Sequence, residues 1–343
     1  MIDPAHRRNW RRWWSIGGAL IGLSALAWVL WRVEYARMGE VLDQASIAFL
    51  LMVPLAIAAE QFARAWKWRQ LLFAIRPVGT LRLFGAIMAG YFANVLVPLG
   101  ISPIVRSWLV ARLEALKMSA VLATAVIDRL IDGLIFSGLV AIAVAFAAFP
   151  DPTGNIRLAL MVGGTASLAL FTILLFAFAR YKRRAGEWTP RLVAILPARF
   201  AGSLKGVMLS FAGGIVWPRE VWRGLAIVFA SIVIKMIAVS HFLWAGLAFG
   251  VLLRPVDYVF LVVFLGFLII LGRLARIPGG FFFGAIFALD LLGVPEEKAL
   301  AMVLLVQLAS MLTVSSVGAF ALWRSGMALD DLRLVKANDV ESA

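Results

Sequence analysis

Residues 158–179 read LALMVGGTASLALFTILLFAFA and contain no charged side chain. A helix of about 20 apolar residues crosses the hydrocarbon core of a bilayer, so this stretch predicts a membrane span. Arg180, Lys182, Arg183 and Arg184 follow it closely. Because basic residues collect on the cytoplasmic side of membrane proteins, we expect this span to run inward.

The composition extends this interpretation to the whole chain. Of its 343 residues, 63% are hydrophobic and 15% are charged, and the mean hydropathy is +0.94. Soluble proteins carry about 25% charged residues. The apolar excess is spread along the sequence, which excludes a large catalytic domain outside the membrane.

Residue counts exclude several kinds of chemistry. The chain has no cysteine and two histidines, so we expect no disulfide, no thiol chemistry, no metal centre and no cofactor. We assign no catalytic residue. The net charge of +14 is attributed to membrane topology and to anionic lipid headgroups, and no nucleic-acid partner is expected.

The apolar runs predict an all-α fold, a polytopic bundle of about eight membrane spans. Residues 1–15 form a basic cytoplasmic tail, 16–325 a single transmembrane domain, and 326–343 a polar cytoplasmic tail. Within the domain, 16–31 and 47–63 are expected spans, and 191–218 is an amphipathic helix on the inner surface. The basic residues that follow the second span are expected at the cytoplasmic surface: Arg64, Lys67, Arg69, Arg76 and Arg82.

Two stretches combine short apolar runs with helix breakers. Residues 83–98 and 101–116 predict a re-entrant hairpin broken at Pro98 and Gly100, because two full crossings would place basic residues outside. Residues 256–293 are either two plain spans or a second hairpin, broken at Pro278, Gly279 and Gly280.

The two stretches suggest an internal repeat. The two prolines lie 180 residues apart, and Arg129 lies 178 residues before Gln307. These offsets raise the hypothesis of repeat-like halves around 83–132 and 258–310. Topology would make such a repeat inverted, an architecture in which transporters place a substrate site near the midplane.

Charged residues within the predicted spans are the candidate binding residues, because an ionisable group there costs at least about 2.5–3.5 kcal/mol. Asp128 and Asp132 lie four positions apart on one helical face, with Arg129 between them in sequence. This group either binds substrate or is neutralised internally. The same choice between binding and a structural role holds for three further residues: Asn94, Arg106 and Lys235.

The motifs around these residues resemble the lysylphosphatidylglycerol synthase transmembrane-region family of flippase-like proteins. The resemblance rests on GYFANVLVP at 90–98, Arg106, DRLIDG at 128–133 and IPGG at 277–280. It implies a bacterial inner-membrane protein that moves or presents lipids, with Asn94, Arg106 and Arg129 at motif positions. Ser102-Pro103 replaces a usual Gly-Glu, and Ala285 and Phe282 replace a usual glutamate and glycine.

The missing acids favour a lipid with an anionic or neutral headgroup over a cationic one. We therefore expect a lipid translocase without its own energy source, with a polar lining formed by Asp128, Arg129, Asp132 and Lys235 and a phosphate held by Arg106. Two alternatives remain open. One is a partner of an enzyme of hopanoid or glycolipid biosynthesis, and the other is a membrane transferase that modifies lipids.

Overall fold

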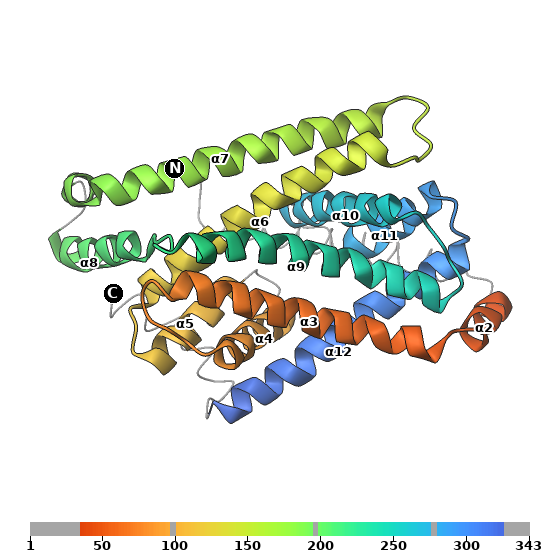
Figure 1. The fold of residues 1–343 in the computed structure, drawn as a ribbon, viewed down its shortest axis with the longest axis horizontal. Coiled ribbons are helices and arrows are strands. Elements are labelled where there is room, and N and C mark those ends of the chain that lie inside the picture. Colours follow the sequence, from red (N-terminus) through yellow and green to blue (C-terminus); the bar gives the residue numbers. More distant parts are fainter. Residues whose placement is uncertain (1–34, 97–100, 195–197, 276–279, 326–343) are drawn as a thin grey trace, which may run out of the picture. The chain divides into compact units, whose positions relative to one another are not determined.

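The computed structural model describes residues 35–96, 101–194, 198–275 and 280–325 (Figure 1). Within these residues the fold is entirely helical. The predicted span at 16–31 and both tails lie outside the described residues, as do Pro98, Gly100, Pro278 and Gly279. The helices in chain order are α2 (Tyr35–Asp43), α3 (Ile47–Leu72), α4 (Thr80–Leu96), α5 (Ser102–Glu114), α6 (Met118–Phe146), α7 (Asn155–Val193), α8 (Ala198–Gly214), α9 (Val221–Ala248), α10 (Pro255–Ala275), α11 (Gly280–Leu291) and α12 (Glu296–Arg324).

Five of these helices are long and apolar enough to cross a membrane: α3, α6, α7, α9 and α12. Helix α3 continues to Leu72, nine residues beyond the predicted end of this span at residue 63. The side chains from Arg64 to Arg69 are good helix formers, and no glycine or proline interrupts them. Their basic residues therefore belong to the helix and not to a loop.

Helix α7 has 39 residues, which corresponds to about 58 Å and exceeds the thickness of a hydrocarbon core. Its basic last third continues the helix beyond the apolar stretch through Pro190 to Val193. The predicted start of the surface helix at residue 191 is therefore wrong. The separate helix in this region is α8, at Ala198–Gly214.

Helices α4 and α5 pack against each other, and so do α10 and α11. With 17 and 13 residues, α4 and α5 rise about 26 and 20 Å, less than the roughly 30 Å of a hydrocarbon core. Helix α11 has 12 residues and rises about 18 Å. These lengths favour a re-entrant hairpin for 83–116. Helix α10 has 21 residues and rises about 32 Å, so helix length does not decide between two plain spans and a hairpin for 256–293.

A glycine permits the close approach within the first hairpin. A Cβ atom added to Gly90 of α4 would lie 2.9 Å from the backbone oxygen of Ser102 at the start of α5. A side chain at this position would push the two helices apart.

The chain forms two compact units, and the five long helices contribute to both. Unit 1 contains residues 1–53, 138–164 and 239–307, and unit 2 contains 54–137, 165–238 and 308–343. Helices α3, α7 and α12 begin in unit 1 and end in unit 2, whereas α6 and α9 begin in unit 2 and end in unit 1. The α4–α5 hairpin belongs wholly to unit 2 and the α10–α11 hairpin to unit 1.

The order of long helix, hairpin, long helix therefore occurs twice, as α3–α6 and as α9–α12. Helices α5 and α11 begin 178 residues apart, and so do α6 and α12. This spacing equals the Arg129-to-Gln307 offset in the sequence. The two hairpins belong to different units, and the inverted repeat stays a prediction.

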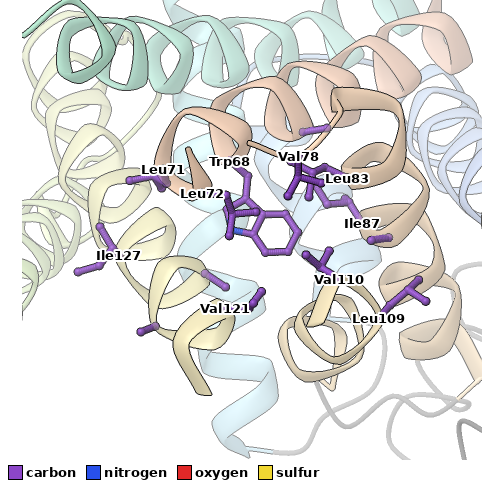
Figure 2. Close-up of a cluster of buried hydrophobic side chains, with 14 of the residues drawn as sticks. Trp68, Leu71, Leu72, Val78, Leu83, Ile87, Leu109, Val110, Val121 and Ile127 are labelled. Atoms are coloured by element: carbon purple, nitrogen blue, oxygen red, sulfur yellow. The ribbon is translucent and has the colours of Figure 1, made fainter. Parts of the chain in front are cut away.

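An apolar cluster holds the first half of unit 2 together. Figure 2 shows Trp68 of α3 among side chains of α4, α5 and α6. Its indole nitrogen donates a hydrogen bond to Thr124 Oγ1 at 3.0 Å, so the ring is fixed in position. The other labelled members of this cluster are Leu71, Leu72, Val78, Leu83, Ile87, Leu109, Val110, Val121 and Ile127.

Unit 1 has its own aromatic packing. The rings of Phe149 and Phe260 stack with centroids 4.3 Å apart, which joins the segment after α6 to α10. Near the start of α10, Asp257 accepts hydrogen bonds from the Arg254 side chain at 2.8 and 3.0 Å. These contacts stabilise the packing of unit 1.

Candidate functional site

Unit 2 contains a group of charged side chains that lie close together on four of its helices. We call the following residues the buried charge cluster: Glu60, Arg64 and Lys67 of α3, Arg106 of α5, Asp128, Arg129 and Asp132 of α6, and Lys235 of α9. Most of these side chains are inaccessible, and Arg64, Arg129 and Lys235 are partly buried.

Lys67 occupies the centre of the cluster and is fully buried. Its Nζ atom lies 2.7 Å from Asp128 Oδ1 and 2.5 Å from Asp132 Oδ1. It also donates to Ser231 Oγ of α9 at 3.2 Å. One ammonium group thus bridges two carboxylates on the same face of α6 and connects three helices.

Arg64 lies one turn before Lys67 on α3 and forms a second bridge. Its Nη2 atom lies 2.6 Å from Glu60 Oε1, and its Nη1 atom lies 3.1 Å from Asp132 Oδ2. Because Glu60, Arg64 and Lys67 are spaced by four and three residues, a helix presents them on one face. This face of α3 therefore pairs with Asp128 and Asp132.

Arg106 connects the hairpin to the same carboxylates. Its Nη2 atom is 3.5 Å from Asp128 Oδ2, a long contact, and its guanidinium carbon lies 4.8 Å from the centroid of the Trp68 ring. The side chain is 1% exposed, yet its Nε atom has no hydrogen-bond partner among the described residues. Arg106 is consequently held mainly by its contact with the Trp68 ring and by electrostatic attraction to Asp128, and less by direct hydrogen bonds.

Two further cations complete the cluster. Arg129 donates a hydrogen bond from Nη2 to the Tyr91 hydroxyl of α4 at 3.2 Å. Lys235 lies over the ring of Phe136, with Nζ 5.6 Å from the ring centroid. Arg129 thus contacts a neutral hydroxyl, and Lys235 contacts an aromatic ring.

The predicted residues thus divide into two groups. Arg106, Asp128 and Asp132 come together directly, while Arg129 and Lys235 lie within electrostatic range of carboxylates without pairing. Asp132 pairs with Lys67 and Arg64 of α3 and not with the neighbouring Arg129, so cations of the protein neutralise this carboxylate. Asn94, near the end of α4, has a buried side-chain oxygen without a hydrogen-bond partner among the described residues, and no contact joins it to the cluster.

The sequence interpretation missed the contribution of α3. It placed Arg64 and Lys67 at the cytoplasmic surface, but both are buried and paired. The signal that could have revealed them is the spacing of Glu60, Arg64 and Lys67, which puts one acid and two bases on a single helical face. Tyr91 was likewise part of a quoted motif without an assigned role.

Among the described residues, no group of histidine, aspartate and glutamate has the arrangement of a metal site. The three carboxylates of the cluster instead pair with cations. The arrangement can bind a charged or strongly polar ligand, since Arg129 and Lys235 keep donors that no carboxylate saturates.

Long apolar helices, two short packed hairpins and a cluster of buried charges define a multi-pass α-helical membrane protein. The family described as lysylphosphatidylglycerol synthase TM region matches residues 15–318, and the chain belongs to this family. The resemblance seen in the motifs is thereby confirmed. No match is found among curated proteins or among solved structures.

Proposed function

We propose that this protein moves polar lipids across a bacterial inner membrane without an energy source of its own. The observation that carries this proposal is the buried charge cluster, which places five cations and three carboxylates on helices of a membrane bundle. Each such charge is costly to insert, so a cluster of eight favours a role in carrying a polar group. Membership of a lipid-related membrane family is consistent with this role.

The distribution of charge supports an orientation with unit 2 toward the cytoplasm. The described residues of unit 2 include twenty lysines and arginines against six acidic residues, whereas those of unit 1 include five against seven. Positively charged segments are retained on the cytoplasmic side. Helix α12 ends in unit 2, so this orientation makes the C-terminus cytoplasmic.

The proposed movement uses the paired and unpaired charges differently. Lys67 and Arg64 hold α3 to α6 through Asp128 and Asp132. Arg129 and Lys235 are left to contact the lipid headgroup. The headgroup would thereby exchange water for protein hydrogen bonds, which lowers the barrier to crossing the hydrocarbon core.

The test is lipid movement in vesicles that contain the purified full-length protein. Fluorescent phospholipid in the inner leaflet is protected from dithionite unless it moves, so the rate of loss of fluorescence reports translocation. We expect faster loss than in protein-free vesicles, and we expect the Asp132→Asn variant to abolish this gain. Asp290→Asn is the matched control, because Asp290 is exposed on α11 in unit 1.

Vesicle flotation and monodispersity confirm that each variant is folded and inserted. Wild-type protein that moves no lipid, or Asp132→Asn protein that moves lipid at the wild-type rate, would refute the proposal.

A second candidate function rests on α7. The basic end of this helix continues past the apolar stretch and is largely exposed from Arg180 to Arg184. Such a surface suits a non-catalytic partner of a lipid-biosynthesis enzyme. Co-purification of one enzyme that is lost when Arg183 and Arg184 are replaced by glutamine, together with no lipid movement by the isolated protein, would favour this function.

A further inference from the structure

The basic end of α7 and helix α8 pack against each other within unit 2 (Figure 1). The rings of Phe178 and Phe211 lie with their centroids 5.8 Å apart. The Tyr181 hydroxyl donates a hydrogen bond to the backbone oxygen of Met208 at 3.2 Å. These contacts turn the face of α7 that carries Phe178 and Tyr181 toward α8.

The opposite face of α7 is basic and exposed. The buried residues of this end continue the face of Tyr181 at four-residue spacing: Ala185, Thr189 and Val193. Four exposed arginines lie within an arc of about 100° on the other side of the helix. We call them the arginine face: Arg180, Arg183, Arg184 and Arg191. The exposed Glu187 lies among them, so four positive charges and one negative charge give this surface a net charge of +3.

The arginine face extends farther than lipid headgroups reach. Arg191 is 12 residues after Ala179, the last residue of the apolar stretch, and so lies about 18 Å farther along the helix axis. Even a helix tilted by about 40° rises about 14 Å over this distance, whereas the headgroup layer on each side of a bilayer is about 5–8 Å thick. Lipids can contact Arg180, but an occupant of the whole face has to approach from the water.

The chain itself contains a segment of opposite charge. Residues 326–343 include four acids against Arg333 and Lys336, a net charge of −2. The acids are Asp330, Asp331, Asp339 and Glu341. A second copy of the chain would bring a face of the same positive charge, which is repelled, whereas this segment is electrostatically complementary to the arginine face.

The segment 326–343 is attached within reach of the arm. It follows α12, which ends at Arg324 in unit 2, the unit that also contains the basic end of α7. Eighteen residues span up to about 60 Å when extended, comparable with the length of about 58 Å of α7 itself. Tethering gives such a segment an effective concentration on the order of millimolar, so a few weak ion pairs are enough to bind it.

We propose that residues 326–343 bind to the arginine face of α7 and cover it. The bound segment occupies the surface that the second candidate function gives to a partner protein, so an acidic partner has to displace it. This inference concerns α7 and not the buried charge cluster, and it holds whether or not the protein moves lipid.

A pair of cysteines tests this contact without changing a charge. Gly186 is exposed beside the arginine face, and a Cβ atom added there meets no atom within 4 Å. The Gly186→Cys/Ala337→Cys variant therefore carries one thiol on the arm and one in the segment, and the chain has no other cysteine.

The purified full-length variant in uncharged detergent is treated with a short bis-maleimide, and mass spectrometry measures the cross-linked peptide. We expect a cross-link within one chain as the main product. Its yield should fall at least about fivefold between about 0.1 M and about 1 M salt, because the screening length shortens from about 10 Å to about 3 Å. A yield that does not depend on salt would overturn the electrostatic contact.

Gly79→Cys/Ala337→Cys is the matched control. Gly79 is also an exposed glycine of unit 2 with no atom within 4 Å of an added Cβ atom, and it lies near other basic side chains, Arg76 and Arg82. This pair should cross-link at least about fivefold less than the Gly186 pair if the segment selects the arginine face. Equal yields would mean random collision and would overturn the proposal.

An exchange of charges tests the pairing directly. In the Gly186→Cys/Ala337→Cys protein, Arg183→Glu with Arg184→Glu should lower the yield at least about fivefold, and adding Asp330→Lys with Asp331→Lys should restore at least about half of it. Both arginines are exposed, so the exchange leaves the folded core intact. Arg112→Glu, at an exposed position of α5, should leave the yield unchanged. Absence of rescue would overturn the pairing.

Two further outcomes would identify a different occupant. A cross-linked product of twice the chain mass would identify a second copy of the protein on the arginine face. A cross-link that is present in phosphatidylcholine vesicles and lost in phosphatidylglycerol vesicles would identify the anionic membrane surface. Either result would overturn the binding of residues 326–343.

Discussion

Replacing Lys67 by methionine tests whether the charge cluster is a coupled unit. The substitution keeps the length of the apolar stem and removes the ammonium group. Asp128 and Asp132 then lose contacts of 2.7 and 2.5 Å, respectively. They retain only Arg106 at 3.5 Å and Arg64 at 3.1 Å.

Removing one partner of a buried ion pair costs about 3–5 kcal/mol, because the remaining charge is left uncompensated. Proton uptake sets an upper limit on this loss of stability. An uncompensated carboxylate can take up a proton instead of remaining charged, and protonating an ordinary aspartate at pH 7 costs about 4 kcal/mol. We therefore expect the Lys67→Met variant to lose about 3–4 kcal/mol of stability. For domains of 150–250 residues each kcal/mol shifts the unfolding temperature by about 2–4 °C, so the shift should be at least about 6 °C.

The assay is thermal unfolding in detergent, followed by the fluorescence of the chain's 13 tryptophans. Lys117→Met is the matched control, because Lys117 is exposed just before α6. The Lys67→Met/Asp132→Asn double variant should recover more than about 1 kcal/mol relative to the sum of the single variants, since it removes one uncompensated carboxylate. Additive losses, or a Lys67→Met shift no larger than that of Lys117→Met, would refute the coupling.

Two further predictions concern the hairpin and the topology. Ala115 ends α5 in the left-handed conformation, with φ of 51°, so Ala115→Gly should raise stability by about 0.5–1 kcal/mol in the same unfolding assay, and a lower unfolding temperature would contradict this. Because the chain has no cysteine, single cysteines at Gly79, Lys117 and Asn155 can be labelled in vesicles. Those at Gly79 and Lys117 should react from one face and that at Asn155 from the other, and labelling of Gly79 and Lys117 from opposite faces would disprove the re-entrant α4–α5 hairpin.

Composition and charge predicted much of the fold, because few kinds of backbone structure can cross a bilayer. The span over 158–179 follows from apolar length, and the structure contains the corresponding helix α7. The hairpin at 83–116 followed from the cost of placing Arg106, Arg112 and Lys117 outside. Each of these inferences uses only local sequence and a general property of membranes.

The pairing of the charges could not be predicted in the same way. Lys67 and Asp132 are 65 residues apart, and their contact depends on how α3 packs against α6. The positive-inside tendency assigned Lys67 to the surface because it treats basic residues as solvated. Once α3 continues to Leu72, Lys67 lies within the helix and its charge needs a partner.

Lys235 also shows that local sequence does not predict which charges pair. Its position in the middle of an apolar helix correctly marked it as unusual. In the structure Lys67, and not Lys235, is directly paired with Asp128 and Asp132. A local pattern identifies a charge that requires an explanation, whereas competition among cations from different helices decides which one pairs.

The two halves of the chain provide an internal comparison for the role of the cluster. At the 178-residue spacing shared by α5–α11 and α6–α12, Arg106 corresponds to Gly284, Arg129 to Gln307 and Asp132 to Ser310. The second half builds the same order of long helix, hairpin and long helix with uncharged residues at these positions. Because apolar packing can replace buried ion pairs without loss of stability, the fold alone does not require the charges of the first half. The concentration of charges around Lys67 therefore supports the proposed binding of a polar ligand more than a role in helix packing alone.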